Sequence, residues 1–341
     1  MSLEVSIKKK FKGFCLDEDF EAGDTLGILG ESGSGKTLTL KCIAGIIKPD
    51  KGKIVLNGKT LFDSEKRINL PPAKRKIGYM FQNYALFPNM TVEENIFAGM
   101  DTPKERKEMI LNRILPFFGL ESVRKKYPGE ISGGEAQRCA LARIIVRKPD
   151  LILLDEPFSA LDSFRKYTIE DELFEILDKL EIPVILVSHD KNEIYRRCRE
   201  VCVLDKGKSL GIKPTKELFA NPGFFSEAKL IGVRNFFKVN RVSENEVEAP
   251  ELNLKLNYTG DCDFIGINQR DFCFSEEGEI TIEGEIYSVT EDRDENIICV
   301  KSGEKKIFAS ASPKDKTFET GEKITLSVDR NKILFLRDSV Y

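Results

Sequence analysis

Short apolar runs alternate with segments of helical periodicity through the first half of the chain. The apolar runs predict buried strands at 25–29, 53–56, 77–81, 151–154, 184–187 and 201–204. Apolar residues that recur every three or four positions predict helices at 37–47, 103–118, 135–146 and 164–180. Strands that alternate with helices are typical of a mostly parallel sheet covered by helices on both faces. We therefore expect an α/β domain in this half.

The pattern changes after about residue 225. Alternating apolar and polar positions predict short strands at 285–289, 296–300, 306–309, 323–328 and 332–335. Turn residues such as Ser302-Gly303 and Gly321 separate these strands. Evenly spaced short strands indicate a small all-β barrel. We place the domain boundary near residue 230, which gives an α/β domain at 1–230 and a β domain at 231–341.

Composition agrees with two ordinary globular domains. Hydrophobic residues make up 41% and charged residues 32% of the 341 positions, enough to bury a sizeable core. The net charge of −3 provides no basic field, so we expect no nucleic-acid partner. The short basic clusters at 8–10 and 74–76 predict solvated faces.

Composition also excludes some kinds of site. The apolar runs are far shorter than the about 20 residues of a membrane-spanning helix, and the first residues contain no apolar signal segment. The 8 cysteines are scattered singly and the chain has 1 histidine, which disfavours a zinc site. We expect reduced cysteines that act as small apolar residues.

A glycine-rich loop stands between a predicted strand and a predicted helix. Its sequence matches GxxxxGK[ST], a pattern that cradles phosphates with backbone N–H groups at a helix N-terminus. Lys36 is expected to neutralise the β- and γ-phosphates, and the Thr37 hydroxyl to take a Mg²⁺ position. The predicted nucleotide-binding loop consists of Gly30, Glu31, Ser32, Gly33, Ser34, Gly35, Lys36 and Thr37.

The apolar strand at 151–154 ends in two carboxylates, Asp155 and Glu156. In phosphate-loop proteins an Asp at such a strand end reaches the metal shell. The next carboxylate projects in another direction, so Glu156 is expected to polarise an attacking water as a general base. These features alone leave kinases and GTPases open.

A second glycine pair precedes the predicted helix at 135–146. Its sequence, Ile131-Ser132-Gly133-Gly134-Glu135, places a Ser and two glycines at a helix N-terminus, which is a second anion-binding device. With the loop and the Asp155 strand, it resembles the signature of the ABC ATPase superfamily. The resemblance implies a P-loop ABC cassette with a helical subdomain at about 83–148, followed by an OB/TOBE-like barrel. It also implies a homodimer in which Ser132, Gly133 and Gly134 contact the nucleotide held by the other subunit.

Other landmarks of this superfamily follow in the expected order. Gln82 resembles the Q-loop residue that senses Mg²⁺ and the attacking water. The stretch Ser159-Ala160-Leu161-Asp162 resembles the D-loop, which adds Asp162 to the nucleotide site. His189, the one histidine, stands where the family places its γ-phosphate contact. The resemblance thus implies a catalytic set of Lys36, Gln82, Glu156 and His189, and a metal set of Thr37, Gln82 and Asp155.

Two features depart from the family pattern or leave it open. Glu135 replaces the usual Gln of the signature and brings a negative charge near the partner's nucleotide, although it suits the helix dipole; we expect activity to survive. Phe11 and Phe14 are both candidates for stacking on adenine, and core packing is the alternative for each.

The remaining resemblance concerns the type of ABC protein. Residues 83–92 resemble the importer class, in which this region accepts a short helix of the membrane subunit. Residues 51–75 and 217–235 resemble molybdate importer ATPases. The resemblance implies ATP and Mg²⁺ as cofactors, permease partners at the cytoplasmic face of the membrane, an external solute-binding protein and an oxyanion cargo. Sulfate, tungstate, iron or sugar import, and a soluble non-transport ABC ATPase, are the alternatives. The sequence does not identify what the barrel binds.

Overall fold

The computed structural model describes residues 2–23, 25–100, 103–159, 163–291, 295–313 and 317–338. The chain forms two compact units, Met1–Lys216 and Glu217–Tyr341. The units divide before residue 230 because helix α8 (Phe225–Ile231) packs on the second unit: the Phe225 ring lies 4.5 Å from the Phe236 ring and 5.0 Å from the Phe264 ring. Among the described residues, no helix is long and apolar enough to cross a membrane.

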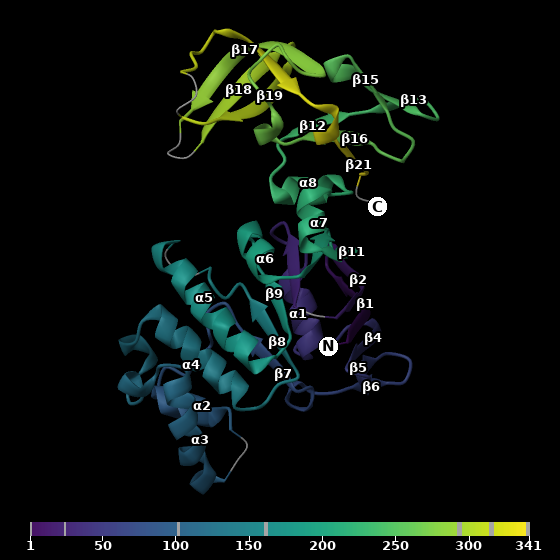
Figure 1. Ribbon diagram of the computed structural model, residues 1–341. Coiled ribbons are helices and arrows are strands. Elements are labelled where there is room, and N and C mark those ends of the chain that lie inside the picture. Colours follow the sequence, from purple (N-terminus) through teal and green to yellow (C-terminus); the bar gives the residue numbers. More distant parts are fainter. Residues whose placement is uncertain are drawn as a thin grey trace. The chain divides into compact units, whose positions relative to one another are not determined.

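The first unit is built on an 11-stranded sheet in the order β6-β5-β4-β1-β2-β11-β10-β3-β9-β8-β7 (Figure 1). Its strands are β1 (Leu3–Phe11), β2 (Phe14–Ala22), β3 (Leu26–Gly30), β4 (Lys51–Leu56), β5 (Lys59–Asp63), β6 (Ile68–Asn69), β7 (Ile77–Met80), β8 (Leu151–Asp155), β9 (Val184–Val187), β10 (Glu200–Asp205) and β11 (Lys208–Pro214).

The sheet is mixed rather than mostly parallel. Strands β10, β3, β9, β8 and β7 pair in parallel, as the sequence predicts for buried apolar runs. Strands β1, β2, β4 and β5 pair antiparallel and were not all predicted. Strands β1 and β2 bury one face only, so charged residues such as Lys8 alternate with core residues such as Ile7 and interrupt the apolar runs.

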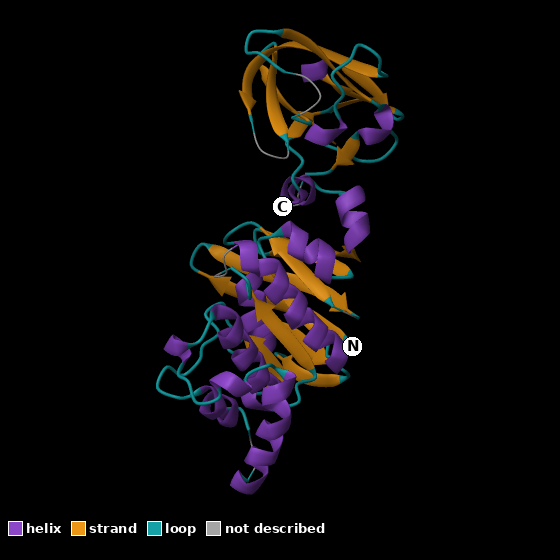
Figure 2. Ribbon diagram, turned by 60° about the vertical axis from the view of Figure 1, so that its left-hand side comes forward, coloured by secondary structure: helices purple, strands orange, loops and turns teal. Residues whose placement is uncertain are grey.

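Helices cover the sheet and form a group beside β7 (Figures 1 and 2). Helix α1 (Lys36–Ala44) contacts β2, β3, β7 and β8, and α4 (Gly133–Ile145) contacts β7 and α2 (Val92–Ala98). The other helices are α3 (Lys104–Phe117), α5 (Ser163–Leu180), α6 (Lys191–Arg197) and α7 (Thr215–Ala220). The predicted helical subdomain at 83–148 corresponds to the segment that contains α2, α3 and α4.

The second unit consists of three small sheets with the strand orders β12-β16-β21, β13-β14-β15 and β19-β18-β17-β20. One hydrophobic cluster joins all three, with Ile265, Val247 and Val300 as fully buried members. The strands are β12 (Asn235–Lys238), β13 (Asn240–Ser243), β14 (Glu246–Ala249), β15 (Leu254–Asn257), β16 (Phe264–Ile267), β17 (Ile280–Thr290), β18 (Asn296–Ser302), β19 (Lys305–Ala311), β20 (Lys323–Val328) and β21 (Leu334–Leu336).

The prediction of a solvated face at 74–76 is wrong for Arg75. Its side chain is 1% exposed, and its guanidinium donates to Ile43 O at 2.8 Å, Cys42 O at 3.0 Å and Leu70 O at 2.8 Å. The last carbonyls of a helix lack intrahelical partners and carry partial negative charge. Arg75 therefore caps the C-terminal end of α1, while Lys74 and Lys76 are exposed.

One carboxyl group is buried at a core position of β2. Glu18 is 1% exposed, accepts a 3.5 Å hydrogen bond from Thr39 Oγ1, and its Oε2 has no partner among the described residues. Burial, with a smaller contribution from Asp17, raises the pKa of Glu18 from its usual 4.5 to about 8. The folded chain therefore holds this proton at neutral pH, whereas the unfolded chain releases it above about pH 4.5.

Glu18→Gln should change how stability depends on pH. Because the folded pKa is raised, the contribution of Glu18 is fully present below its unfolded pKa and is lost as pH rises towards 8, by about 3 kcal/mol between pH 5 and 8. We expect urea unfolding to show Glu18→Gln gaining stability relative to the unaltered chain across this window. A stability difference that stays constant from pH 5 to 8 would contradict a neutral, buried Glu18.

Candidate functional site

The glycine-rich loop joins the end of β3 to the start of α1. A Cβ atom at Gly30 would lie 2.4 Å from Ser34 Oγ and 2.6 Å from Leu204 O, so the backbone turns in a space that only glycine fits. Gly35 has φ +113° directly before α1. The buried Ser34 Oγ has no hydrogen-bond partner among the described residues. This loop thus leaves a polar group and a helix N-terminus available to an anion.

Lys36 is a buried cation at the head of α1. Its Nζ donates to Gly30 O at 2.8 Å and Glu31 O at 3.0 Å. Burial lowers the pKa of Lys36, and the carboxylates of Glu156 and Asp155 oppose this shift. Two neutral carbonyls are weak compensation for a buried ammonium, so an anion brought to this point would be strongly favoured.

Asp155 ends β8 beside the loop and is held by two hydroxyl groups. Thr37 Oγ1 donates to its Oδ1 at 2.9 Å, and the Tyr79 hydroxyl donates to its Oδ2 at 2.7 Å. The carboxyl ends of parallel strands meet at one edge of a sheet, which is why β3 and β8 bring these residues together. Thr37 and Asp155, two of the three predicted metal residues, carry the oxygen ligands that Mg²⁺ prefers, so these two fit this ion.

Glu156 and His189 complete the cavity. Glu156 adopts the left-handed conformation with φ +50°, and its N–H donates to Val187 O at 3.0 Å. Strained backbone of this kind is found at functional sites, where the surrounding structure enforces it. His189 Nδ1 lies 3.5 Å from Glu156 Oε2, and the imidazole is 63% exposed. The cavity measures about 440 Å³ and is lined by Ser32, Gly33, Gly35, Lys36, Thr37, Leu38, Glu156 and His189.

A buried network fixes the turn that carries His189. Ser188 Oγ donates to Glu193 Oε2 at 2.5 Å and accepts from Asp190 N at 2.9 Å. Lys166 of α5 forms salt bridges with Glu193 and, at 2.8 Å, with Asp190. Asp190 also caps α6 by accepting from Asn192 N at 2.9 Å. The backbone on the C-terminal side of His189 is therefore anchored, while its ring is open to solvent.

Gln82 reaches the site through Ser159. Gln82 Nε2 donates to Ser159 Oγ at 3.1 Å, and Ser159 Oγ donates to Glu156 O at 3.0 Å. After Gln82 the chain takes two left-handed residues, Tyr84 and Ala85. Arg143 of α4 donates to both of their carbonyl oxygens, at 2.9 Å and 2.8 Å respectively. Hydrogen bonds therefore link α4 to the segment after Gln82, and Gln82 to the backbone of Glu156, the predicted general base.

The second glycine pair begins α4 with a complete capping box. Glu135 N donates to Ser132 Oγ at 3.3 Å, and the Glu135 carboxylate accepts from Ser132 N at 2.7 Å and Ser132 Oγ at 2.8 Å. These hydrogen bonds lower the pKa of Glu135. Within the described part of the chain, the lining of the Lys36 cavity does not include Ser132, Gly133 or Gly134.

Comparison with known proteins places this arrangement in a family. The family profile for "ABC transporter" matches residues 15–159. The "Glucose import ATP-binding protein GlcV" of Saccharolobus solfataricus is 32% identical over 95% of this chain and 95% of its own length. The chain belongs to the ABC transporter family.

Other members of the family differ in what they import. The "Molybdenum import ATP-binding protein ModC" of Vibrio parahaemolyticus is 37% identical over 64% of this chain, and the match spans 60% of that relative's length. The dimeric, post-hydrolysis structure of the ATP-binding cassette MJ0796 bound to ADP and Pi is 25% identical, with a TM-score of 0.51 over 63% of this chain and 99% of that cassette. The predicted fold class, an ABC cassette followed by a small β domain, is confirmed.

Two predicted parts of the nucleotide site stay predictions: the role of Asp162 and the choice of the ring that stacks on adenine. Asp162 lies outside the described residues, so the structure does not locate it. Phe11 and Phe14 flank the β1–β2 turn, with ring centroids 6.3 Å apart. Phe14 packs close to the loop, since a Cβ at Gly35 would lie 3.2 Å from its Cζ, whereas Phe11 is exposed. Both readings of these rings, adenine stacking and core packing, stay predictions.

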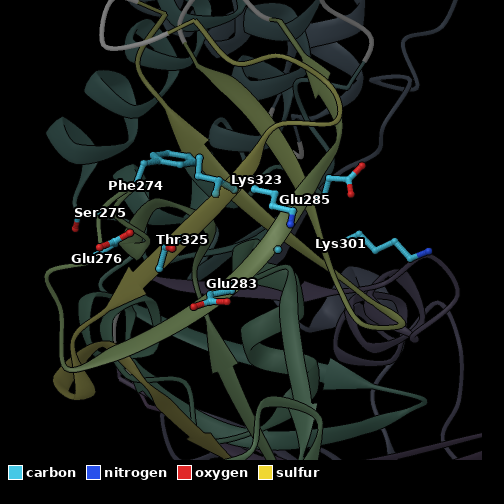
Figure 3. Close-up of a pocket in the computed structure, with 10 residues that line it drawn as sticks. Phe274, Ser275, Glu276, Glu283, Glu285, Lys301, Lys323 and Thr325 are labelled. Carbon is cyan, nitrogen blue, oxygen red and sulfur yellow. The ribbon is translucent and has the colours of Figure 1, made fainter.

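The β domain has a cavity of its own, of about 670 Å³, lined in part by residues of β17, β18 and β20 (Figure 3). Its charged lining residues are Glu276, Glu283, Glu285, Lys301 and Lys323. The carboxylates do not converge on one point in Figure 3, and the described residues contain no cluster suited to a metal ion. Three carboxylates against two ammonium groups also disfavour an oxyanion here.

Sequence patterns did not identify four residues that support the site. These are Tyr79, Arg143, Lys166 and Glu193. Each acts through a contact between segments distant in sequence, so no local motif marks it. The signal available in the sequence is weak: a polar residue inside an apolar strand or on the apolar face of a helix, as for Tyr79 and Arg143.

Glu135→Ala should destabilise the start of α4. It removes the acceptor of two hydrogen bonds from Ser132, and losing a capping interaction costs about 1 kcal/mol. Glu135→Gln is the matched control, because its amide oxygen keeps an acceptor at the same place. We expect thermal unfolding to order the chains as unaltered, Glu135→Gln, then Glu135→Ala. Equal midpoints for all three would show that the capping box does not form in solution.

Proposed function

We propose that this chain is the ATP-hydrolysing subunit of an importer that takes up an oxyanion, molybdate, through partner permease subunits. The observation that supports the ATPase part is the buried Lys36 ammonium, which lines one cavity together with Glu156 and His189. A cation and a candidate base in the same cavity suit transfer of a phosphoryl group to water.

Each residue of the site has its own role in the proposed hydrolysis of ATP. Lys36 and the N–H groups of the loop bind the β- and γ-phosphates and stabilise the charge of the transition state. Glu156 accepts a proton from the water that attacks the γ-phosphorus, and His189 and Gln82 orient that water. Thr37, Asp155 and Gln82 would hold Mg²⁺, which when bound would neutralise charge on the phosphate oxygens.

The complete site requires two copies of the chain. Ser132 and Gly133 are exposed at the start of α4 and lie outside the lining of the Lys36 cavity in the described residues. A Ser hydroxyl and free N–H groups at a helix N-terminus suit the phosphates of a second copy. Asp162 is assigned to the same interface, and the dimeric cassette MJ0796 supports this arrangement.

A groove beside the site is the candidate surface for the permease. It measures about 730 Å³ and lies between β7, the segment after Gln82 and α4. Its lining includes the apolar side chains of Phe81, Phe87 and Ile144, and Lys76 and Arg147 add positive charge. Apolar side chains in a groove of this size suit a short helix with an apolar face. Docking there would hold the chain at the cytoplasmic face of the membrane.

Molybdate is the proposed cargo because of the similarity to the Vibrio molybdenum protein. The glucose import relative aligns over more of both chains, so sugar import is the principal alternative. Sulfate, tungstate and iron are the others. In this scheme the permease and an external solute-binding protein select the cargo, and the ATPase residues are common to all of these systems.

Glu156→Gln should separate ATP binding from hydrolysis. The amide is close in size to the carboxylate but does not take the proton of the attacking water, and general base catalysis contributes about 10²–10⁴-fold. We expect ATP affinity to stay within about twofold and hydrolysis to fall at least about a hundredfold. The trapped ATP should also shift the variant towards dimers in sedimentation. Turnover near that of the unaltered chain would remove Glu156 from the role of base.

Uptake by cells that lack this gene tests the cargo. We expect the unaltered chain, but not Glu156→Gln, to restore uptake of labelled molybdate, with labelled sulfate unaffected. Lys48→Met, at an exposed position outside the lining of the Lys36 cavity, serves as the control variant. If molybdate uptake does not respond, molybdate is not the cargo, and labelled glucose is the next substrate to measure.

A further inference from the structure

Tyr79 lies in β7, one strand away from the proposed metal residue Asp155. Strand β7 pairs in parallel with β8, with Tyr79 opposite Leu153. This register brings the phenol to the carboxyl end of β8, where its hydroxyl donates to Asp155 Oδ2 at 2.7 Å. Thr37 Oγ1 donates to the other oxygen of the same carboxylate at 2.9 Å. Asp155 is therefore held from both sides by hydroxyl groups.

The hydrogen bond from Tyr79 to Asp155 is part-buried. Asp155 is only 7% exposed, so water does not readily replace a missing donor.

The side chain of Tyr79 also lines the groove proposed for the permease. This groove of about 730 Å³ also contains Phe81 and Phe87. The Tyr79 and Phe81 rings pack at 4.4 Å between centroids, which fixes the direction of the phenol. One side chain therefore forms part of the groove wall and holds a carboxylate of the nucleotide site.

We propose that Tyr79 is a positioning residue that orients Asp155 for Mg²⁺ and connects the groove to the metal site. The inference rests on the proposed function, because it takes the metal to be held by Thr37 and Asp155. A partner that moves the Tyr79 ring would change the direction of the carboxylate, and residues that orient metal ligands typically alter metal affinity by about 10–100-fold when they are removed.

Tyr79→Phe tests this role because it removes the hydroxyl and keeps the ring. We expect the Mg²⁺ concentration that gives half-maximal ATP hydrolysis to rise about tenfold. The affinity for ATP in the presence of EDTA should stay unchanged, since Asp155 acts through the metal. Direct titration of the chain and ATP with Mn²⁺, followed by electron paramagnetic resonance, should show the same weakening without any turnover. Tyr167→Phe, which removes the hydroxyl of an exposed tyrosine in α5, is the matched control and should behave as the unaltered chain.

The outcomes separate this inference from the proposed function. If Tyr79→Phe lowers the melting temperature but leaves the Mg²⁺ and Mn²⁺ dependences unchanged, Tyr79 has a structural role only and the inference is overturned. If the variant weakens ATP binding equally in EDTA, the effect does not pass through the metal, and the inference is also overturned. If the unaltered chain itself binds no ATP, the proposed function fails and the inference fails with it.

Discussion

The Lys36 ammonium lies buried at the head of α1, where its hydrogen bonds go to the carbonyl oxygens of Gly30 and Glu31. A buried cation with neutral partners is unfavourable, and burial lowers its pKa for that reason. The loop turns in a space that only glycine fits, and Ser34 Oγ is left without a described partner. The carboxylates of Glu156 and Asp155 offset only part of the effect of burial on Lys36. Binding of an anion next to Lys36 therefore offsets the free-energy cost of burying its ammonium group.

The parallel half of the sheet brings the remaining groups to this cation. Strands β3, β8 and β9 end at the same edge, so the loop, Asp155 and the turn that carries His189 become neighbours. The left-handed backbone of Glu156 turns its carboxylate towards the imidazole, at 3.5 Å. Hydrogen bonds then link this edge outward, through Ser159 to Gln82 and through Tyr79 to the groove. The Lys36 cavity and the groove are thus linked through side-chain hydrogen bonds.

Local patterns predicted the parts of the molecule that depend on local chemistry. Buried apolar runs predicted β3, β8 and β9, and the glycine-rich loop, the Asp155-Glu156 pair and the helix N-terminus at Ser132 were recognised from a few consecutive residues. Strands β1 and β2 were missed because one face is solvated and their charged positions interrupt the apolar pattern. Arg75 and Glu18 were missed for another reason: their burial depends on α1, a distant segment that supplies carbonyl groups to one and covers the other. Tyr79 belongs with them, since its role comes from the register between β7 and β8.

The central claim is that the buried Lys36 ammonium is the anchor for the phosphates of ATP. Calorimetric titration with ATP tests it most directly, comparing the unaltered chain with Lys36→Met, which keeps the length and apolar character of the side chain. Lys48→Met, at an exposed position after α1, is the matched control. Because a charge-assisted hydrogen bond is worth about 1.5–3 kcal/mol, we predict that Lys36→Met binds ATP up to about 100-fold more weakly and that Lys48→Met binds it normally. Equal affinity in all three chains would contradict the account.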